Sequence, residues 1–452
     1  MKPIANLLLF CGAVATASAA IAFEQRDFQR PIVDSHPAAW RTTQQSNQSS
    51  PPSYREPLLA LHKSLVEIPS TTGYGGEDKV AYFLVDYLTK RGYTAQLQAV
   101  PAKSEDKTKR YNVLAWPVTN SSSDLPSGRK PRVLVTSHID VVPPFIPYGI
   151  DAENVSDITS DTAIRGRGSV DAKASVAAQI VAVEALLAAG EVHPEDLMLL
   201  YVVGEETTGD GMKHFSASLR DQTPAQGFEA AIFGEPTGNK LACGHKGITG
   251  GWIRAKGKAG HSGYPSLGKS ATELLLRALV KILDADLGSS DRFGNTTVNV
   301  GRLTGGVAGN VIPKDAGALV TARIAAGNFT TGHLMVKEKV WEILKETDED
   351  AFTVDWTFGY GPVKCNCDIE GTFSQSLPPS IREPKPLSDV GFETLVTNYG
   401  TDVANLEGKH VSYLYGPGTI LVAHGDNEAL KVGDLEDAVE GIKKIIKHTL
   451  SQ

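Results

Sequence analysis

Pro131-Arg-Val-Leu-Val-Thr-Ser-His138-Ile-Asp140-Val-Val-Pro143 is the stretch that decides the fold, because an apolar, β-branched run ends directly in polar residues. Short apolar runs of this kind are typical of strands buried in the sheet of an α/β protein. Residues i and i+2 of a strand share a face, so Asp140 is expected to lie behind His138. We interpret Asp140 as the acceptor of the second ring N–H of His138, which fixes its tautomer and raises its basicity toward a metal.

Three further apolar runs also end in candidate ligands. They are residues 199–204 before Glu205 and Glu206, residues 230–234 before Glu235, and residues 419–423 before His424. Open α/β sheets bind ligands beyond the carboxyl ends of their strands, so we expect these side chains at one sheet edge. The adjacent Glu205 and Glu206 would repel each other without compensating positive charge, which a metal ion supplies.

Asp171 lies in the glycine-containing loop Arg165-Gly-Arg-Gly168-Ser-Val-Asp171-Ala-Lys-Ala, which opens an alanine-rich helix predicted over residues 171–189. Its two carboxylate oxygens are enough to bridge two cations, so we interpret it as a bridging ligand. One glutamate of the adjacent pair then binds metal. Its neighbour stays free to take a proton from metal-bound water and to pass it to a leaving amine.

Each of these features has a purely structural interpretation when it is taken alone. A histidine at a strand end is more often a hydrogen-bonded structural residue, and adjacent glutamates are usually a solvated surface feature. Gly234-Glu-Pro-Thr237 also suits a turn. The combination, in this order and after apolar strands, favours the metal site. Mixed histidine and carboxylate ligands suit zinc, and also cobalt or manganese.

The chain resembles the di-zinc exopeptidases and deacylases that include glutamate carboxypeptidase, acetylornithine deacetylase, succinyl-diaminopimelate desuccinylase and aminoacylase. The resemblance runs from Tyr54 to the C-terminus and rests on motifs that occur in the family's order. They are Ser137-His-Ile-Asp-Val-Val-Pro143, Gly166-Arg-Gly-Ser-Val-Asp-Ala-Lys173, Glu205-Glu206, Gly234-Glu-Pro-Thr237 and His424-Gly-Asp-Asn-Glu428. Ala174 stands where the family more commonly has glycine, a departure outside the ligand set.

The resemblance implies two zinc ions that share Asp171 as a bridge. It assigns Glu206 and His424 to one ion, and His138 and Glu235 to the other. It also implies that Glu205 is the general base and acid of the reaction.

A separate domain is predicted between Glu235 and His424. Residues 245–361 predict the order βαββαβ, which is typical of a small ferredoxin-like domain. Its predicted strands cover residues 250–258, 296–303, 317–324 and 352–358, and its predicted helices cover residues 270–284 and 332–347. In the family this insert is a lid and often a dimerisation surface, so the resemblance leaves two alternatives, a homodimer through the insert or a monomer whose lid closes.

Three residues of the insert match family positions that contact substrate. The resemblance implies that His261 reaches the substrate carbonyl, frequently from a partner subunit, and that Asn310 and Arg323 grip a substrate carboxylate. A guanidinium group and an amide donor suit a carboxylate, and a histidine suits a developing oxyanion. Without the resemblance, Arg323 on a strand of a small domain would be interpreted as a solvated side chain.

The length of 452 residues also favours more than one domain. Alternating strands and helices indicate an α/β fold, with a three-layer catalytic domain around a mixed, mostly parallel sheet. The predicted parts are a signal peptide (1–22), a flexible leader (23–53), a catalytic domain in two pieces (54–244 and 362–452) and the inserted lid (245–361). The net charge of −8 argues against nucleic acid as a partner.

The N-terminus has the plan of a secretory signal peptide, with Lys2, an apolar run over residues 4–14 and small residues at 17–20. The apolar run is too short to span a bilayer, and no other long apolar segment follows it. Asn-x-Ser/Thr triplets agree with a glycosylated secreted protein and occur at Asn47, Asn120, Asn154, Asn295 and Asn328. We therefore expect an extracellular protein that is free of the membrane.

The cysteines predict one disulfide at most in the mature protein. Removal of Cys11 with the signal peptide leaves Cys243, Cys365 and Cys367, an odd number. We expect a bridge from Cys243 to either of the other two. A zinc site on Cys365-Asn-Cys367 is an alternative, although two-residue spacers are more typical of such sites.

We expect a secreted zinc metallohydrolase that cleaves an amide bond next to a free C-terminal carboxylate. It would act on a peptide or an N-acyl amino acid, as a carboxypeptidase or a deacylase, by Glu-assisted attack of zinc-bound water. A di-zinc aminopeptidase is an alternative, but such enzymes generally carry aspartate in place of Glu235 and lack the insert. An inactive binding protein on the same fold and a single structural zinc are further alternatives, and the retention of Glu205 argues against the first.

Overall fold

The computed structural model describes residues 50–101, 109–118, 131–220, 227–367 and 391–451. Pro52–Gln452 form one compact unit. The predicted signal peptide, nearly all of the predicted leader, Cys11, Asn47 and Asn120 lie outside the described residues. Among the residues that are described, no helix is long and apolar enough to cross a membrane.

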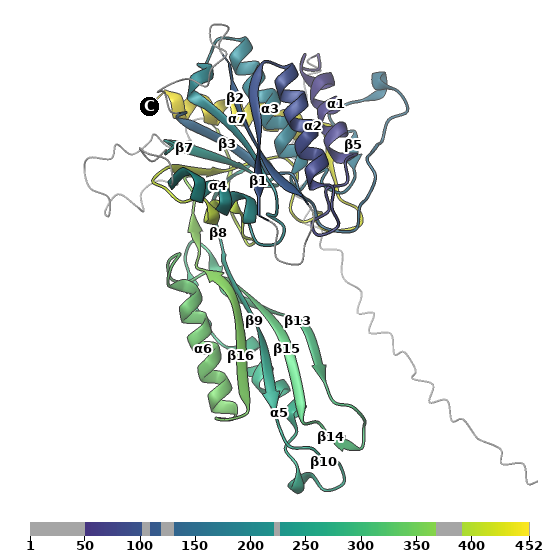
Figure 1. Ribbon diagram of the computed structural model, residues 1–452, viewed down its shortest axis with the longest axis vertical. Coiled ribbons are helices and arrows are strands. Elements are labelled where there is room, and N and C mark those ends of the chain that lie inside the picture. Colours follow the sequence, from purple (N-terminus) through teal and green to yellow (C-terminus); the bar gives the residue numbers. More distant parts are fainter. Residues whose placement is uncertain (1–49, 102–108, 119–130, 221–226, 368–390, 452) are drawn as a thin grey trace, which may run out of the picture. The chain divides into compact units, whose positions relative to one another are not determined.

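A nine-stranded mixed sheet forms the centre of the fold (Figure 1). Its strands are β1 (Tyr93–Val100), β2 (Arg110–Pro117), β3 (Val133–His138), β6 (Leu197–Val202), β7 (Ala230–Gly234), β8 (Leu241–His245), β17 (Val363–Lys364), β18 (Thr394–Thr397) and β19 (Val411–Leu414). The four neighbouring strands β6, β3, β7 and β19 are parallel, whereas β1, β2 and β17 pair antiparallel toward the two edges. The predicted mixed sheet is confirmed, with its parallel part in the middle.

Helices cover both faces of this sheet. On one face lie α1 (Arg55–Val66), α2 (Glu77–Lys90), α3 (Lys173–Ala188) and α7 (Val432–Leu450), and on the other lies α4 (Asp210–Arg220). Side chains of β3 alternate between the two apolar cores, with Val133 and Val135 in the first and Leu134 in the second. The predicted three-layer α/β architecture is therefore confirmed.

The parallel strands deliver the candidate ligands to one edge because they run in the same direction and end together. Strand β3 is buried along its whole length and ends at His138. Strand β6 leads into Glu205 and Glu206, and β7 leads directly into Glu235. The apolar, β-branched runs predicted these strands because both faces of each strand are covered.

A second, four-stranded antiparallel sheet follows in the chain. Its strands, in spatial order, are β13 (Thr297–Gly305), β15 (Asp315–Ile324), β9 (Gly247–Lys256) and β16 (Phe352–Tyr360). Helices α5 (Ala271–Asp284) and α6 (Gly332–Thr347) share an apolar core with one of its faces. The chain order βαββαβ agrees with the predicted ferredoxin-like plan.

Residues 419–423 do not form the predicted strand. Thr419 makes only an isolated antiparallel bridge to Thr237, residues 420–423 lie in a turn, and Leu421 is 87% exposed. The strand that precedes His424 is β19, which pairs in parallel with β7. A run of four apolar residues, 420–423, is too short to distinguish a strand from an apolar turn, and Gly418, just before Thr419, has a φ of 70°.

A disulfide joins Cys243 of β8 to Cys367, whose Cα atoms lie 4.8 Å apart. This is one of the two pairings left open by the sequence. The thiol of Cys365 is free and buried. The alternative of a zinc site on Cys365 and Cys367 is therefore wrong.

Candidate metal centre

His138 is the most enclosed of the candidate ligands, since its side chain is 1% exposed. Its Nε2 lies 3.0 Å from Asp171 Oδ1 and 3.9 Å from Glu235 Oε1. Its Nδ1 lies 3.0 Å from the backbone carbonyl oxygen of Asp140. The imidazole is thereby oriented with Nε2 toward the carboxylates.

The role predicted for the Asp140 carboxylate is only partly what the structure shows. Its Oδ1 lies 3.6 Å from His138 Nδ1, farther than the backbone carbonyl of the same residue. The carboxylate instead accepts the backbone N–H groups of Glu205 and Glu206, each at 3.2 Å, and the hydroxyl of Thr72 at 2.8 Å. Asp140 therefore fixes the turn that carries the two glutamates.

Asp171 presents its two carboxylate oxygens to two different histidines. Oδ1 lies 3.0 Å from His138 Nε2, and Oδ2 lies 3.4 Å from His424 Nε2. Asp171 lies two residues before the buried helix α3, in the loop predicted for it. Each oxygen of Asp171 therefore faces a different histidine.

Glu205 and Glu206 sit in the turn that follows β6. Gly204 begins this turn with a φ of 76°, a conformation that L side chains rarely adopt. A Cβ atom at Gly204 would also lie 3.0 Å from Arg110 Nη2. Glycine at this position lets the chain turn sharply, so that Glu206 Oε2 reaches 3.0 Å from His424 Nε2.

Glu235 follows β7 directly, and the preceding glycine lets this strand end pack closely. A Cβ atom at Gly234 would lie 2.6 Å from Gln179 Nε2 and 2.6 Å from Ser175 Cβ, both on α3. The hydroxyl of Tyr399 donates to the carbonyl of Pro236 at 3.2 Å. Glu235 is thus held on a well-packed strand end beside His138.

Burial and mutual repulsion shift the pKa values of the clustered acids. Burial, together with the charge of Asp171, raises the pKa of Glu206 to about 7. Burial, together with the charge of Glu235, raises the pKa of Glu205 well above its usual value, and burial does the same for Glu235. Hydrogen bonds to Asp171 and Glu206 raise the pKa of His424 to about 10. The acids of the cluster therefore resist full ionisation unless further positive charge lies beside them.

The donor set fits metal ions. His138 forms two groups of ligand atoms that lie within 4.8 Å of one another, one with Asp171 and Glu206 and one with Glu205 and Glu235. Glu206 Oε1 is buried and has no hydrogen-bond partner in the part of the chain that the structure describes. Imidazole nitrogens and carboxylate oxygens in one buried cluster suit divalent zinc, cobalt or manganese.

The cluster places one glutamate beside each histidine. His138 lies beside Glu235, His424 lies beside Glu206, and Asp171 lies between the two histidines. Glu205 belongs to the second ligand group. The individual roles stay predictions.

A cavity of about 200 Å³ opens beside these acids and contains two basic side chains, Arg323 and Lys213. Arg323 lies on β15 of the second sheet, where it pairs with Ile248 of β9. Across the described ranges, no residue forms a hydrogen bond or an ion pair with the Arg323 guanidinium. The structure thus brings Arg323 to the acidic cluster, as the prediction requires.

His261 and Asn310 lie elsewhere. His261 belongs to β10 (Gly260–His261), which pairs with β14 (Val311–Ile312), next to Asn310. Both short strands lie beyond the Asp315 end of β15, eight residues from Arg323, which is roughly 26 Å at about 3.3 Å per residue. His261 is exposed, and neither residue lines the cavity beside the acids.

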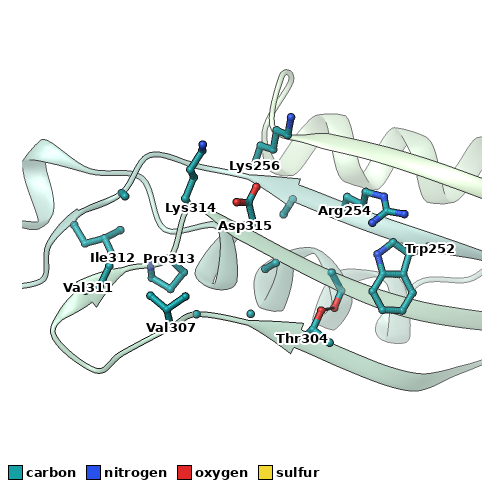
Figure 2. Close-up of a pocket in the computed structure, with 16 residues that line it drawn as sticks. Trp252, Arg254, Lys256, Thr304, Val307, Val311, Ile312, Pro313, Lys314 and Asp315 are labelled. Carbon is teal, nitrogen blue, oxygen red and sulfur yellow. Dashed lines mark hydrogen bonds between the residues drawn. The ribbon is translucent and has the colours of Figure 1, made fainter.

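A larger cavity, of about 580 Å³, lies on the second sheet near β14 (Figure 2). Figure 2 shows Trp252, Arg254 and Lys256 of β9 around it, with Val307 and Ile312 at its other end. It contains none of the candidate metal ligands. We therefore do not assign the reaction to this cavity, although it is larger than the cavity beside the acids.

Sequence reasoning missed three residues of the site. Asp402 is buried, and burial raises its pKa to about 6. Tyr399 and Lys213 line the same cavity as the acids. None of the three follows an apolar strand or belongs to one of the family motifs, so the sequence alone offered no signal for them.

Comparisons with known proteins agree with this site and fold. The model of the family described as peptidase family M20/M25/M40 matches residues 134–448. The chain is 58% identical to a peptidase M20 domain-containing protein of Sordaria macrospora, over 90% of this chain and 87% of that one. It is 40% identical to a probable carboxypeptidase of Aspergillus fumigatus, over 100% and 99% of the two chains.

Solved structures agree on the fold. A tripeptidase from Staphylococcus aureus superposes with a TM-score of 0.67 and 19% identity, covering 88% of this chain and 99% of that one. The family match covers more than half of the sequence and contains every candidate ligand. The predicted family of metal-dependent peptidases is confirmed: this chain belongs to the peptidase family M20/M25/M40.

Proposed function

We propose that the protein is a zinc carboxypeptidase or N-acyl amino acid deacylase, which cleaves an amide bond next to a free C-terminal carboxylate. One observation carries this choice of substrate: the Arg323 guanidinium, which has no partner among the described residues, lines the same cavity as the acidic cluster. A guanidinium group binds a carboxylate through two parallel hydrogen bonds. The full-length relatives named as probable carboxypeptidases support the same choice.

In this proposal two zinc ions per chain would be held by His138, Asp171, Glu206, Glu235 and His424, with Asp171 as the shared ligand. The two oxygens of Asp171 face one histidine each, which supports a bridge. Zinc at this position supplies a Lewis acid that polarises the substrate carbonyl and lowers the pKa of water.

Glu205 is the proposed general base and acid. It is held beside His138 and Glu235 by the backbone hydrogen bond to Asp140, so its carboxylate stays within the cluster. It takes a proton from the attacking water and returns it to the amide nitrogen as the C–N bond breaks. Arg323 meanwhile fixes the carboxylate of the leaving amino acid, which orients the scissile amide toward Glu205.

A panel of three substrates tests the reaction. It contains an N-acylated dipeptide with a free carboxylate, its C-terminally amidated twin and an unblocked aminoacyl substrate. We expect the first alone to be cleaved, with loss of activity after chelation and recovery with zinc. Cleavage of only the unblocked substrate would replace the proposal with an aminopeptidase, and cleavage of none would favour the inactive binding protein.

A homodimer through the insert is part of this proposal. His261 lies at the end of the second sheet opposite Arg323, so it reaches an acidic cluster only through a second copy or a large movement of the insert. The outer face of α5 exposes an apolar stripe at Leu276, Val280 and Leu283, next to the edge strand β13. An unpaired strand edge and an exposed apolar stripe suit a self-complementary interface.

The oligomeric state in solution tests this interface. Light scattering after size-exclusion chromatography should give a dimer for the wild type and a monomer for Val280→Asp. Lys281→Asp, on the same helix, is the matched control, since it changes charge without removing an apolar side chain. A monomeric wild type would contradict the dimer.

Secretion and glycosylation are also proposed. They rest on the signal-like N-terminus and on the exposure of three sequon asparagines, Asn154, Asn295 and Asn328. Expression of the full chain in a fungal host should place the protein in the medium, with a mass that falls on treatment with an N-glycosidase. Retention in the cells would contradict secretion, and an unaltered mass would contradict glycosylation.

A further inference from the structure

A buried ion pair joins two motifs that lie far apart in the sequence. Arg167 Nη1 donates to Glu428 Oε2 at 2.7 Å, and both side chains are 1% exposed. The short sheet of β4 (Gly149–Ile150), β5 (Ala163–Arg165) and β20 (Ala429–Lys431) brings the two residues together, because Ala429 pairs with Arg165. The mechanism described above does not use either side chain.

The second oxygen of Glu428 holds the loop of the proposed bridging ligand. Glu428 Oε1 accepts the backbone N–H of Val170 at 2.9 Å and that of Asp171 at 3.2 Å. One buried carboxylate therefore binds Arg167 with one oxygen and the backbone of Asp171 with the other. The position of Asp171 depends on that of Arg167 through this carboxylate.

The guanidinium of Arg167 holds the loop of another proposed ligand. Its Nη2 donates to the carbonyl of His424 at 3.3 Å, and its Nε donates to the carbonyl of Pro144 at 3.2 Å. His424 has a φ of 64°, which L side chains rarely adopt. A residue keeps such a backbone only where its surroundings fix it, and the bond to Arg167 is one such restraint.

We propose that Arg167 and Glu428 form a positioning clamp, which sets the separation of Asp171 and His424 and thereby the affinity of the centre for metal. The two residues touch neither metal nor substrate, so they act through the ligands that they hold. This inference rests on the proposed metal centre. It explains how Asp171 and His424, which lie more than 250 residues apart in the chain, are held in place relative to each other.

The ion pair of Arg55 with Glu436 provides a matched control. It joins α1 to α7 through two hydrogen bonds and reaches none of the candidate ligands. Glu436→Gln removes a charge from this pair in the same way as Glu428→Gln removes one from the clamp. A loss of zinc affinity that is specific to the clamp should therefore be absent from Glu436→Gln.

The experiment measures zinc affinity of the folded, metal-free proteins by competition with a chromophoric chelator, and the visible spectrum of their cobalt forms. Glu428→Gln should lower zinc affinity by about 10- to 100-fold, the usual effect of losing a group that orients a ligand. Arg167→Lys keeps the charge but not the fork of donors, so it should have a smaller effect and remains measurable if Glu428→Gln fails to fold. Both should alter the cobalt spectrum, whereas Glu436→Gln should leave affinity and spectrum unchanged.

The double variant Arg167→Lys/Glu428→Gln adds a test of the clamp as one unit. Its fold-loss of affinity should be smaller than the product of the two single losses, because the two residues share one ion pair, while Arg167 alone holds the carbonyl of His424. Unaltered affinity and spectrum in the folded variants would overturn the clamp, even if they unfold at lower temperature, since a purely structural ion pair predicts that result. A wild type that binds neither zinc nor cobalt would overturn the metal centre itself.

Discussion

His138 and His261 differ in how far the rest of the chain encloses and orients their imidazole rings. His138 is enclosed at a strand end, with its ring held between Asp140 and Asp171. His261 is exposed, and its ring contacts residues close in sequence, Gly263 and Tyr264. The acidic cluster around His138 is therefore assembled within the catalytic core, whereas the role proposed for His261 requires another surface to meet it.

Asp171→Ala should have the largest effect, because it removes the carboxylate that faces both histidines. We expect loss of bound metal and a fall of hydrolysis to the level of the chelated wild type. Metal analysis by mass spectrometry, alongside the assay with the N-acylated dipeptide, measures both. Retention of two metal ions by this variant would contradict the proposed role of Asp171, and with it the contrast between the core and the insert.

Glu205→Gln should lower the rate of hydrolysis without a loss of bound metal. The amide cannot accept the proton from water, so we expect kcat to fall by about 10²- to 10⁴-fold, the usual contribution of a general base. The metal content should stay at the wild-type level. Glu407→Gln, an exposed acid elsewhere in the chain, is the control, and normal turnover by Glu205→Gln would remove Glu205 from the mechanism.

His261→Ala should lower kcat by about 10²- to 10³-fold, the usual effect of losing an oxyanion donor. Subunit mixing sharpens this prediction. If His261 acts on the partner's centre, exchange with Glu205→Gln subunits should restore about a quarter of the wild-type activity, because half of the dimers are mixed and each holds one intact centre. No recovery in exchanged dimers would contradict action across the interface.

Arg323→Ala should have the smallest effect of the four, and a selective one. Loss of a hydrogen bond to a charged group costs about 1.5–3 kcal/mol, so KM should rise by roughly ten- to a hundredfold for substrates with a free carboxylate. Arg254→Ala, on the same sheet but beside the other cavity, should leave KM unchanged. An equal rise in KM for amidated substrates would refute the assigned role of Arg323.

The sequence predicted the core well because burial leaves a strong pattern. Strands covered on both faces are continuous apolar runs, and a polar residue directly after such a run lies at the sheet edge. Those two rules are enough to assign His138, Glu206 and Glu235 to one edge of the sheet. The helix and strand order of the insert followed from the same periodicities, with bounds within a few residues of those observed.

Residues outside such patterns were less predictable. His424 lies in a turn, and only the family resemblance, not the apolar run before it, was a sound reason to select it. Asp402 opens a short 3-10 helix (Asp402–Asn405), and its proximity to the acids follows from tertiary packing alone. The clamp of Arg167 and Glu428 depends on a three-stranded sheet that no alternation in the sequence signalled.

Stepwise addition of zinc to the metal-free protein, with hydrolysis of the N-acylated dipeptide measured at each step, tests most directly that the acidic cluster is a two-metal hydrolytic centre. We predict that activity rises to a plateau at two zinc ions per chain, and that a chelator returns it to the starting level. Full activity without metal, or a plateau at one ion per chain, would contradict the account.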